Sequence, residues 1–155
     1  MAYTGIDLIK KAIIIAKKRC EVYKNISKAM EKNLKVRIVA NILVRNVKKN
    51  IEHYEKLKIQ LENDDETIDF DTYDKISSLF NKFSRRFENP DIRNMEDVLE
   101  FSLSFERQVV ALYVDIQGRL VKNAEDTEKK AYKILSSIIE DKKNHIKNLQ
   151  MYIKK

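Results

Sequence analysis

Hydrophobic and polar residues alternate along four long stretches of the chain with the spacing of an amphipathic helix. In each stretch an apolar residue recurs three or four positions after the previous one, over residues 6–30, 35–61, 95–120 and 127–152. The connections after the first and third stretches are short, so we expect each pair of helices to form an antiparallel hairpin. The pattern therefore predicts an all-α fold, a four-helix bundle made of two hairpins.

A long connection, residues 62–97, joins the two hairpins and could cross the length of the bundle, which would make the second and third helices parallel. Its later part predicts a short fifth helix that covers the bundle, from apolar residues at helical spacing: Ile76, Leu79, Phe80, Phe83 and Phe87. Its first part, residues 62–74, holds seven of the 24 acidic residues. Because this part lacks the glycine and the closing glutamate of a calcium loop, we interpret it as a solvated linker.

Two helix starts can be predicted from capping residues. Thr4 and Asp7 have the spacing of a capping box, in which each side chain binds a free backbone N–H of the first turn. Asn94, with Asp97 three residues later, is a typical N-cap residue for the third long helix. These residues predict that helices begin close to positions 5 and 95.

Composition agrees with a helical protein. The 155 residues include two glycines and one proline, too few for the turns of a β-sandwich, a barrel or a Gly-rich phosphate loop. With 43% hydrophobic residues the chain can form one continuous core, so we expect a single domain over residues 1–155. One cysteine, and apolar runs too short for a signal peptide or a membrane span, predict a cytoplasmic protein.

The net charge of +7 raises the question of nucleic-acid binding. Lysine outnumbers arginine by 23 to 8, however, and arginine is the residue that phosphate and base recognition favour. The sequence also lacks a recognisable nucleic-acid module. We therefore interpret the basic residues as solvated surface and do not expect a nucleic-acid partner.

The two hairpins resemble each other in sequence. Each has a tyrosine on its first helix and a histidine on its second, Tyr23 with His53 and Tyr113 with His145, separated by 30 and 32 residues. The segments around the histidines, KKNIEHYEKL and EDKKNHIKNL, both carry a leucine four residues after the histidine. This internal repeat predicts a pseudo-twofold bundle, in which ligands or metals lie near the symmetry axis.

The segment VLEFSLSFERQVVALYVDI, residues 98–116, resembles the third helix of the rubrerythrin-like branch of the ferritin-like di-iron carboxylate superfamily. The resemblance extends over residues 6–152. It implies a di-iron centre to which each hairpin supplies a glutamate from its first helix and a Glu-x-x-His pair from its second. Residues three apart share a helical face, so such a pair presents a carboxylate and an imidazole to the same metal.

This family pattern is only half present. His53, Glu106 and His145 stand at ligand positions, whereas Ala16, Asn50 and Lys142 replace three of the glutamates. Two divalent ions would bring four positive charges to a site with one carboxylate and a lysine. The uncompensated positive charge is unfavourable in a dry core. We therefore expect no metal, and instead a polar network in which Lys142 pairs with Glu106 and the amide and imidazoles form hydrogen bonds.

Two metal-binding alternatives remain open at this stage. His53, His145 and Glu106 form the two-histidine, one-carboxylate set of mononuclear iron sites, with Asp141 as a substitute ligand, and zinc could use the same set. An altered two-metal site is the other alternative.

The resemblance thus implies a ferritin-like protein with a degenerate metal site and a non-catalytic role, in interaction or regulation. We expect it to act as a homodimer or with an unknown protein partner. The enzymatic alternative is a non-haem iron oxidoreductase acting on peroxide or oxygen. Cys20, Tyr23 and Tyr113 are interpreted as core residues.

Overall fold

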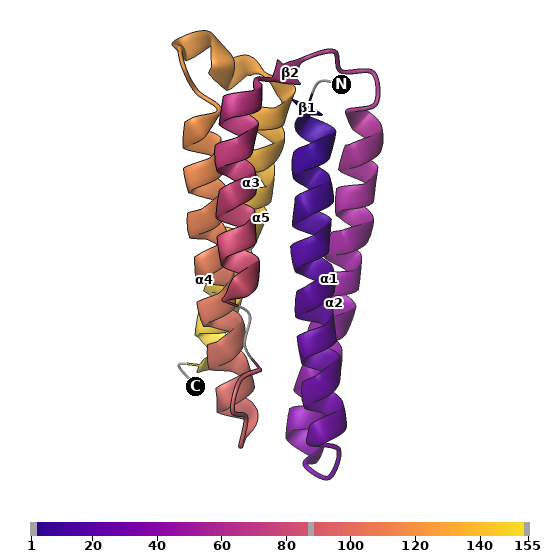
Figure 1. Cartoon of the computed structure of the whole chain (residues 1–155). Coiled ribbons are helices and arrows are strands. Elements are labelled where there is room, and N and C mark those ends of the chain that lie inside the picture. The colour runs from indigo at the N-terminus through magenta and orange to yellow at the C-terminus, as the bar shows by residue number, and fades with distance from the viewer. Residues whose placement is uncertain (1–2, 87–88, 154–155) are drawn as a thin grey trace.

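The computed structural model describes residues 3–86 and 89–153, and over these residues the protein is almost entirely helical (Figure 1). This confirms the predicted all-α class. The elements are β1 (Tyr3–Thr4), α1 (Gly5–Ala29), α2 (Leu34–Gln60), β2 (Thr67–Ile68), α3 (Phe70–Arg85), α4 (Met95–Arg119), the 3-10 helix η1 (Ala124–Glu128) and α5 (Lys130–Ile153).

The long helices form two antiparallel hairpins, α1 with α2 and α4 with α5 (Figure 1). Helices α2 and α4 run in the same direction, because the chain returns along the molecule between them as α3. The predicted fifth helix is present: Ile76, Phe80 and Phe83 are buried, and α3 packs against α4. Phe87, which was predicted to belong to it, lies outside the described residues.

Both predicted helix starts are confirmed. The backbone N–H of Thr4 donates to Asp7 Oδ2 at 2.9 Å, and the two residues form a capping box at the start of α1. Asn94 Oδ1 accepts from the backbone N–H of Asp97 at 2.9 Å and caps α4. Helix α4 begins at Met95, so residues 95–97 of the predicted connection belong to the helix.

The predicted start of the last helix, at position 127, is wrong. Residues 124–128 form the 3-10 helix η1, and α5 begins at Lys130. The reason is a local capping box at η1, in which the backbone N–H of Asn123 donates to Asp126 Oδ2. The backbone N–H of Lys122 donates to the same oxygen. These hydrogen bonds stabilise a tight turn where apolar spacing alone suggested a continuous helix.

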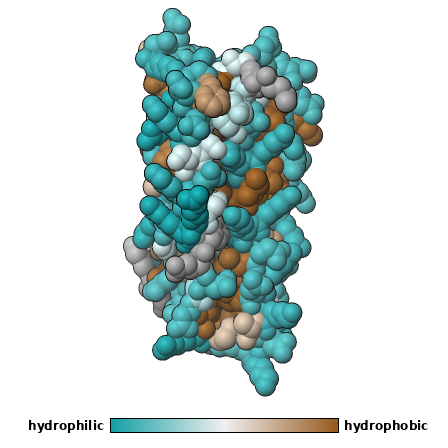
Figure 2. Space-filling model, viewed as in Figure 1, coloured by the Kyte–Doolittle hydropathy of each residue, from teal (hydrophilic) through white to brown (hydrophobic). Residues whose placement is uncertain are grey.

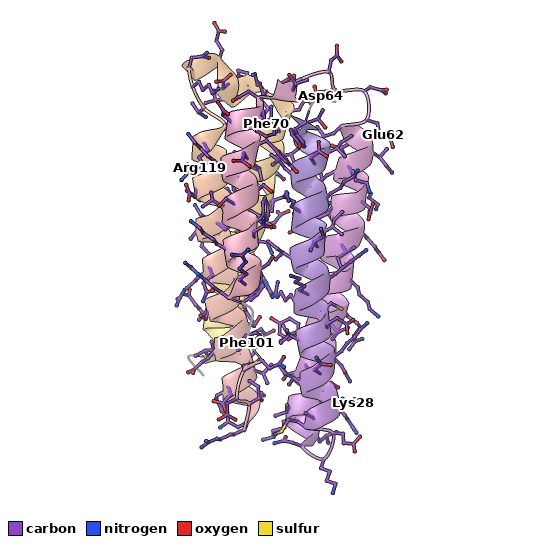
Figure 3. All side chains as sticks on the ribbon, viewed as in Figure 1. Lys28, Glu62, Asp64, Phe70, Phe101 and Arg119 are labelled. Atoms are coloured by element: carbon purple, nitrogen blue, oxygen red, sulfur yellow. The ribbon has the colours of Figure 1, made fainter. Side chains whose placement is uncertain are left out.

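A two-stranded antiparallel ribbon connects the start of the chain to the crossover. Tyr3 pairs with Ile68 and Thr4 with Thr67, and the ring of Tyr3 stacks on that of Tyr73 with centroids 3.7 Å apart. The acidic segment, residues 62–74, begins at this end of the molecule, where Glu62 and Asp64 lie, and Lys28 lies at the other end (Figure 3). Its Asp69 caps α3 and forms an ion pair of 2.7 Å with Lys122.

The core runs along the whole bundle between the two hairpins and under α3. Tyr23 and Tyr113 are fully buried in it, and Cys20 is buried as well. In Figure 2, which shows the same side as Figure 1, hydrophilic residues cover most of the face and hydrophobic residues appear in patches. No helix in the described part of the chain is both long enough and apolar enough to span a membrane.

Candidate functional site

A carboxylate without solvent exposure, that of Glu106 on α4, lies at the centre of the bundle. Arg19 on α1 forms an ion pair with its Oε1 through Nη1. Two residues of α5 approach it as well: Lys142 Nζ lies 3.4 Å from Oε1, and His145 Nδ1 lies 3.1 Å from Oε2. Arg19 and Lys142 are themselves 3% and 7% exposed. We call these four residues the ion cluster.

Arg19 is held by further polar and aromatic contacts. Its Nε donates to the hydroxyl of Tyr23 at 3.0 Å, and its Nη2 donates to Ser102 Oγ at 3.3 Å. The Tyr23 hydroxyl in turn donates to Ser102 Oγ at 2.9 Å. The guanidinium lies over the rings of Tyr23 and Phe105, 5.2 Å from each centroid. A cation that lies over two aromatic rings and also donates several hydrogen bonds is a role suited to arginine.

Helical spacing places these side chains together. Arg19 and Tyr23 are four residues apart on α1, and Ser102 and Glu106 are four apart on α4, so each pair shares one face. The two faces meet across the hairpins through the hydrogen bonds to Ser102. On α5, Lys142 and His145 are three residues apart and point to the same carboxylate.

The electrostatics of the cluster favour an ionised Glu106. Burial alone would raise the pKa of Glu106, but the positive charges of Arg19 and Lys142 and the hydrogen bond from His145 outweigh it, and this pKa lies below its ordinary value. Burial alone would lower the pKa of Arg19, whereas Tyr23 and Glu106 raise it above its usual range. The pKa of the neighbouring Tyr113 is raised by burial, with Tyr54 and Glu106 adding to the effect.

The structure brings together three of the positions that the sequence singled out, Glu106, Lys142 and His145. The prediction that His53 joins them is wrong, because its side chain is 47% exposed and its nearest charged partner is Asp141, with Nε2 to Oδ2 at 3.9 Å. The buried face of α2 contains Tyr54, and His53, one residue earlier, points about 100° away from that face.

The remaining singled-out residues also lie apart from the carboxylate. Ala16 is buried in the apolar core of α1. Asn50 is half-buried and lines a cleft beside the cluster. Asp141, the proposed substitute ligand, has a side chain that is 66% exposed and faces His53 at the surface.

Sequence reasoning missed Arg19, the closest cation to Glu106. It treated the apolar stripe of the first helix as narrow, whereas α1 is buried over a wide face that also contains Ile15, Val22 and Ile26. Arg19 continues their three- and four-residue spacing. An arginine within a second apolar stripe was therefore the signal that could have identified it.

A cleft of about 340 Å³ between α2 and α5 opens beside the ion cluster. Glu106, Lys142 and His145 form its inner end. Its other lining residues are mostly amides and charged groups: Asn46, Lys49, Asn50, His53, Tyr54, Ile138, Asp141, Asn144 and Asn148.

The ion cluster does not fit a di-iron centre. Both oxygens of Glu106 already contact cationic or imidazole partners, so added metal ions would lie against Arg19 and Lys142 without carboxylates to neutralise them. Among the residues that the structure describes, no three His, Cys, Asp or Glu side chains converge in a way that could hold a metal ion. The mononuclear set is not assembled either, since His53 lies at the surface.

Comparison with protein-family models, curated proteins and solved structures found no match to this chain. The resemblance to the ferritin-like superfamily therefore rests on the sequence features described above.

Proposed function

We propose that this protein is a rubrerythrin-like, ferritin-fold bundle whose di-iron site has been replaced by the ion cluster, and that its role is non-catalytic, in interaction or regulation. The observation that carries the proposal is the position of Arg19. It contributes a cation from the first hairpin to the fully buried carboxylate of Glu106, which belongs to the second hairpin.

The cluster joins three of the four long helices that the family's metal centre would join, without a residue from α2. Arg19 and Tyr23 come from α1, Ser102 and Glu106 from α4, and Lys142 from α5. In a di-iron protein the metal ions link both hairpins through their ligands. Here charge-assisted hydrogen bonds cross the same interface, and they supply a link that needs no metal. A buried network of this kind fixes how the hairpins pack without supporting redox chemistry.

Metal analysis of the purified protein tests this proposal directly. The protein should be purified without chelator and without an affinity tag, and its iron and zinc measured per chain. We expect well below one metal ion per chain, because Arg19 and Lys142 already pair with Glu106 and would repel a metal ion. One or two irons or zincs per chain, with a ligand absorption band, would contradict it.

Restoring the ligands tests the positional match with the family. Ala16→Glu, Asn50→Glu and Lys142→Glu replace the missing carboxylates, and Arg19→Leu removes the cation that the structure places at the site. We expect this fourfold variant to bind iron in a folded state. The matched control adds His145→Ala and should bind much less. Absence of iron binding in a folded fourfold variant would count against the ferritin-like origin.

The proposal includes a homodimer that forms through an apolar groove between α2, α4 and α5. The groove has a volume of about 630 Å³ and includes Ile42, Met151 and Tyr152, which are 43%, 63% and 67% exposed. Ile38 lies four residues before Ile42 on the same face and is also exposed. A second copy would cover these side chains. Light scattering should show a dimer for the natural protein and a monomer for Ile42→Glu; a monomeric natural protein would contradict the dimer.

A further inference from the structure

The cleft beside the ion cluster is rich in hydrogen-bond donors. Its described lining includes the side-chain amides of Asn46, Asn50, Asn144 and Asn148 and the ammonium groups of Lys49 and Lys142. Its carboxylates are those of Glu106 and Asp141. Glu106 is already paired with Arg19, and Asp141 is 66% exposed to solvent and faces His53. The cleft lining therefore offers donors from four amides and two lysines, while its one buried carboxylate, that of Glu106, is already paired.

The ion cluster also carries a net positive charge. In the ion cluster the single negative charge of Glu106 faces the guanidinium of Arg19 and the ammonium group of Lys142. Arg19 is the closer partner and is enclosed by Tyr23, Ser102 and Phe105, whereas Lys142 lies at the longer distances of 3.4 and 3.5 Å. The carboxylate therefore neutralises Arg19 first. One positive charge remains at the inner end of the cleft, on a side chain that is only 9% exposed.

Two buried cations that share one carboxylate leave a net positive charge, which is unfavourable because the protein interior solvates it poorly. Lys142 lines the cleft, so an anion entering there would meet its ammonium group without any change of fold. His145 borders the same space, and the asparagines supply neutral donors around it. Charged donors and amides surrounding a small volume are the groups that bind carboxylate and phosphate oxygens.

We propose that this cleft is a binding site for a small oxyanion, of the carboxylate or phosphate type, whose negative charge neutralises Lys142. The volume of about 340 Å³ admits an inorganic oxyanion or a short organic acid and is too small for a nucleic acid or a folded partner. This inference rests on the ion cluster of the proposed function and does not depend on the ferritin-like origin.

Calorimetric titration of the metal-free protein tests the proposal, with inorganic phosphate and acetate as separate probes at constant ionic strength. We expect saturable binding of at least one of the two, with one site per chain. Phosphate alone would indicate a phosphate-type ligand, and acetate alone a carboxylate. Absence of saturable binding for both probes would overturn the proposal, while leaving the metal analysis, and with it the proposed function, unaffected.

Variants separate this site from general attraction to a basic protein. Lys142→Gln should weaken binding at least about tenfold, because it removes the charge-assisted donor. Lys143→Gln is the matched control. Lys143 is exposed and does not line the cleft, so this variant should bind the anion with the affinity of the natural protein. Equal weakening by both variants would show non-specific binding and overturn the proposal.

A second variant keeps the test valid if Lys142→Gln fails to fold. Asn50→Phe places a ring at the half-buried wall of the cleft and leaves every charge of the ion cluster in place. It should reduce binding by filling the space, and folding is checked by circular dichroism. Unchanged affinity in a folded Asn50→Phe protein would mean that the anion binds elsewhere, which overturns the proposal.

Discussion

Replacing Glu106 by glutamine is the most direct perturbation of the ion cluster. Glutamine keeps nearly the same shape, so packing around the side chain is preserved while the negative charge is removed. Arg19 and Lys142, which are 3% and 7% exposed, then remain buried without a counter-charge. The effect on the free energy of unfolding therefore reports the electrostatic role of the carboxylate.

The expected magnitude follows from the burial of all three charges. Removing one partner of a buried ion pair costs about 3–5 kcal/mol, and Glu106 is fully buried with two cationic partners. In a protein of this size each kcal/mol lowers Tm by about 2–4 °C. We therefore expect Glu106→Gln to lower Tm by roughly 6–20 °C.

A triple variant should recover this loss. Arg19→Met, Glu106→Leu and Lys142→Met remove all the charges together, and replacing a whole buried ion cluster by apolar residues is often neutral or stabilising, by about 1–4 kcal/mol. The hydroxyls of Tyr23 and Ser102 keep their mutual hydrogen bond of 2.9 Å, so they are not left without a partner.

Urea unfolding of the natural protein, the single variant and the triple variant, followed by circular dichroism, measures these differences. The order we expect is a strongly destabilised Glu106→Gln protein and a triple variant close to the natural one. The reasoning is refuted if Glu106→Gln is as stable as the natural protein. It is also refuted if the triple variant is as unstable as the single one, since the loss would then come from packing and not from charge.

Four further predictions concern acid stability, two glycines and a helix cap. Because the pKa of Glu106 is lowered on folding, its contribution to the free energy of unfolding is complete above the ordinary glutamate pKa of about 4.3 and is lost as pH falls toward the folded pKa. The free energy of unfolding, measured with urea at a series of pH values, should therefore fall less steeply below the ordinary glutamate pKa for Glu106→Gln than for the natural protein. Gly118→Ala should raise the free energy of unfolding by about 0.5–1 kcal/mol, since an added Cβ would meet no described atom within 4 Å beyond its chain neighbours and its own helix backbone. Gly5→Val should lower it by about 1–3 kcal/mol, because a Cβ there already meets Leu61 at 3.1 Å. Thr4→Ala should cost about 0.5–2 kcal/mol in thermal unfolding by removing the α1 cap; an unchanged Tm in that variant would contradict the capping role.

Much of the fold follows from local sequence. Apolar spacing and capping residues such as Thr4 and Asn94 act within one or two turns of helix, so they could be predicted without knowledge of the tertiary structure. The short connection after α1 and the length of the crossover indicated the arrangement of the hairpins in the same way. The ribbon of Tyr3 and Thr4 with Thr67 and Ile68 was not predictable, because it joins segments more than 60 residues apart.

The candidate site was likewise predictable only in part. The sequence by itself determined that Glu106, Lys142 and His145 lie on faces turned toward the core, because a helical period fixes which residues share a face. Only the tertiary structure decided that Arg19 reaches the carboxylate and that His53 lies at the surface. Periodicity leaves the rotation of each helix about its own axis undetermined, and a rotation of a fraction of a turn decides which long side chain enters the core.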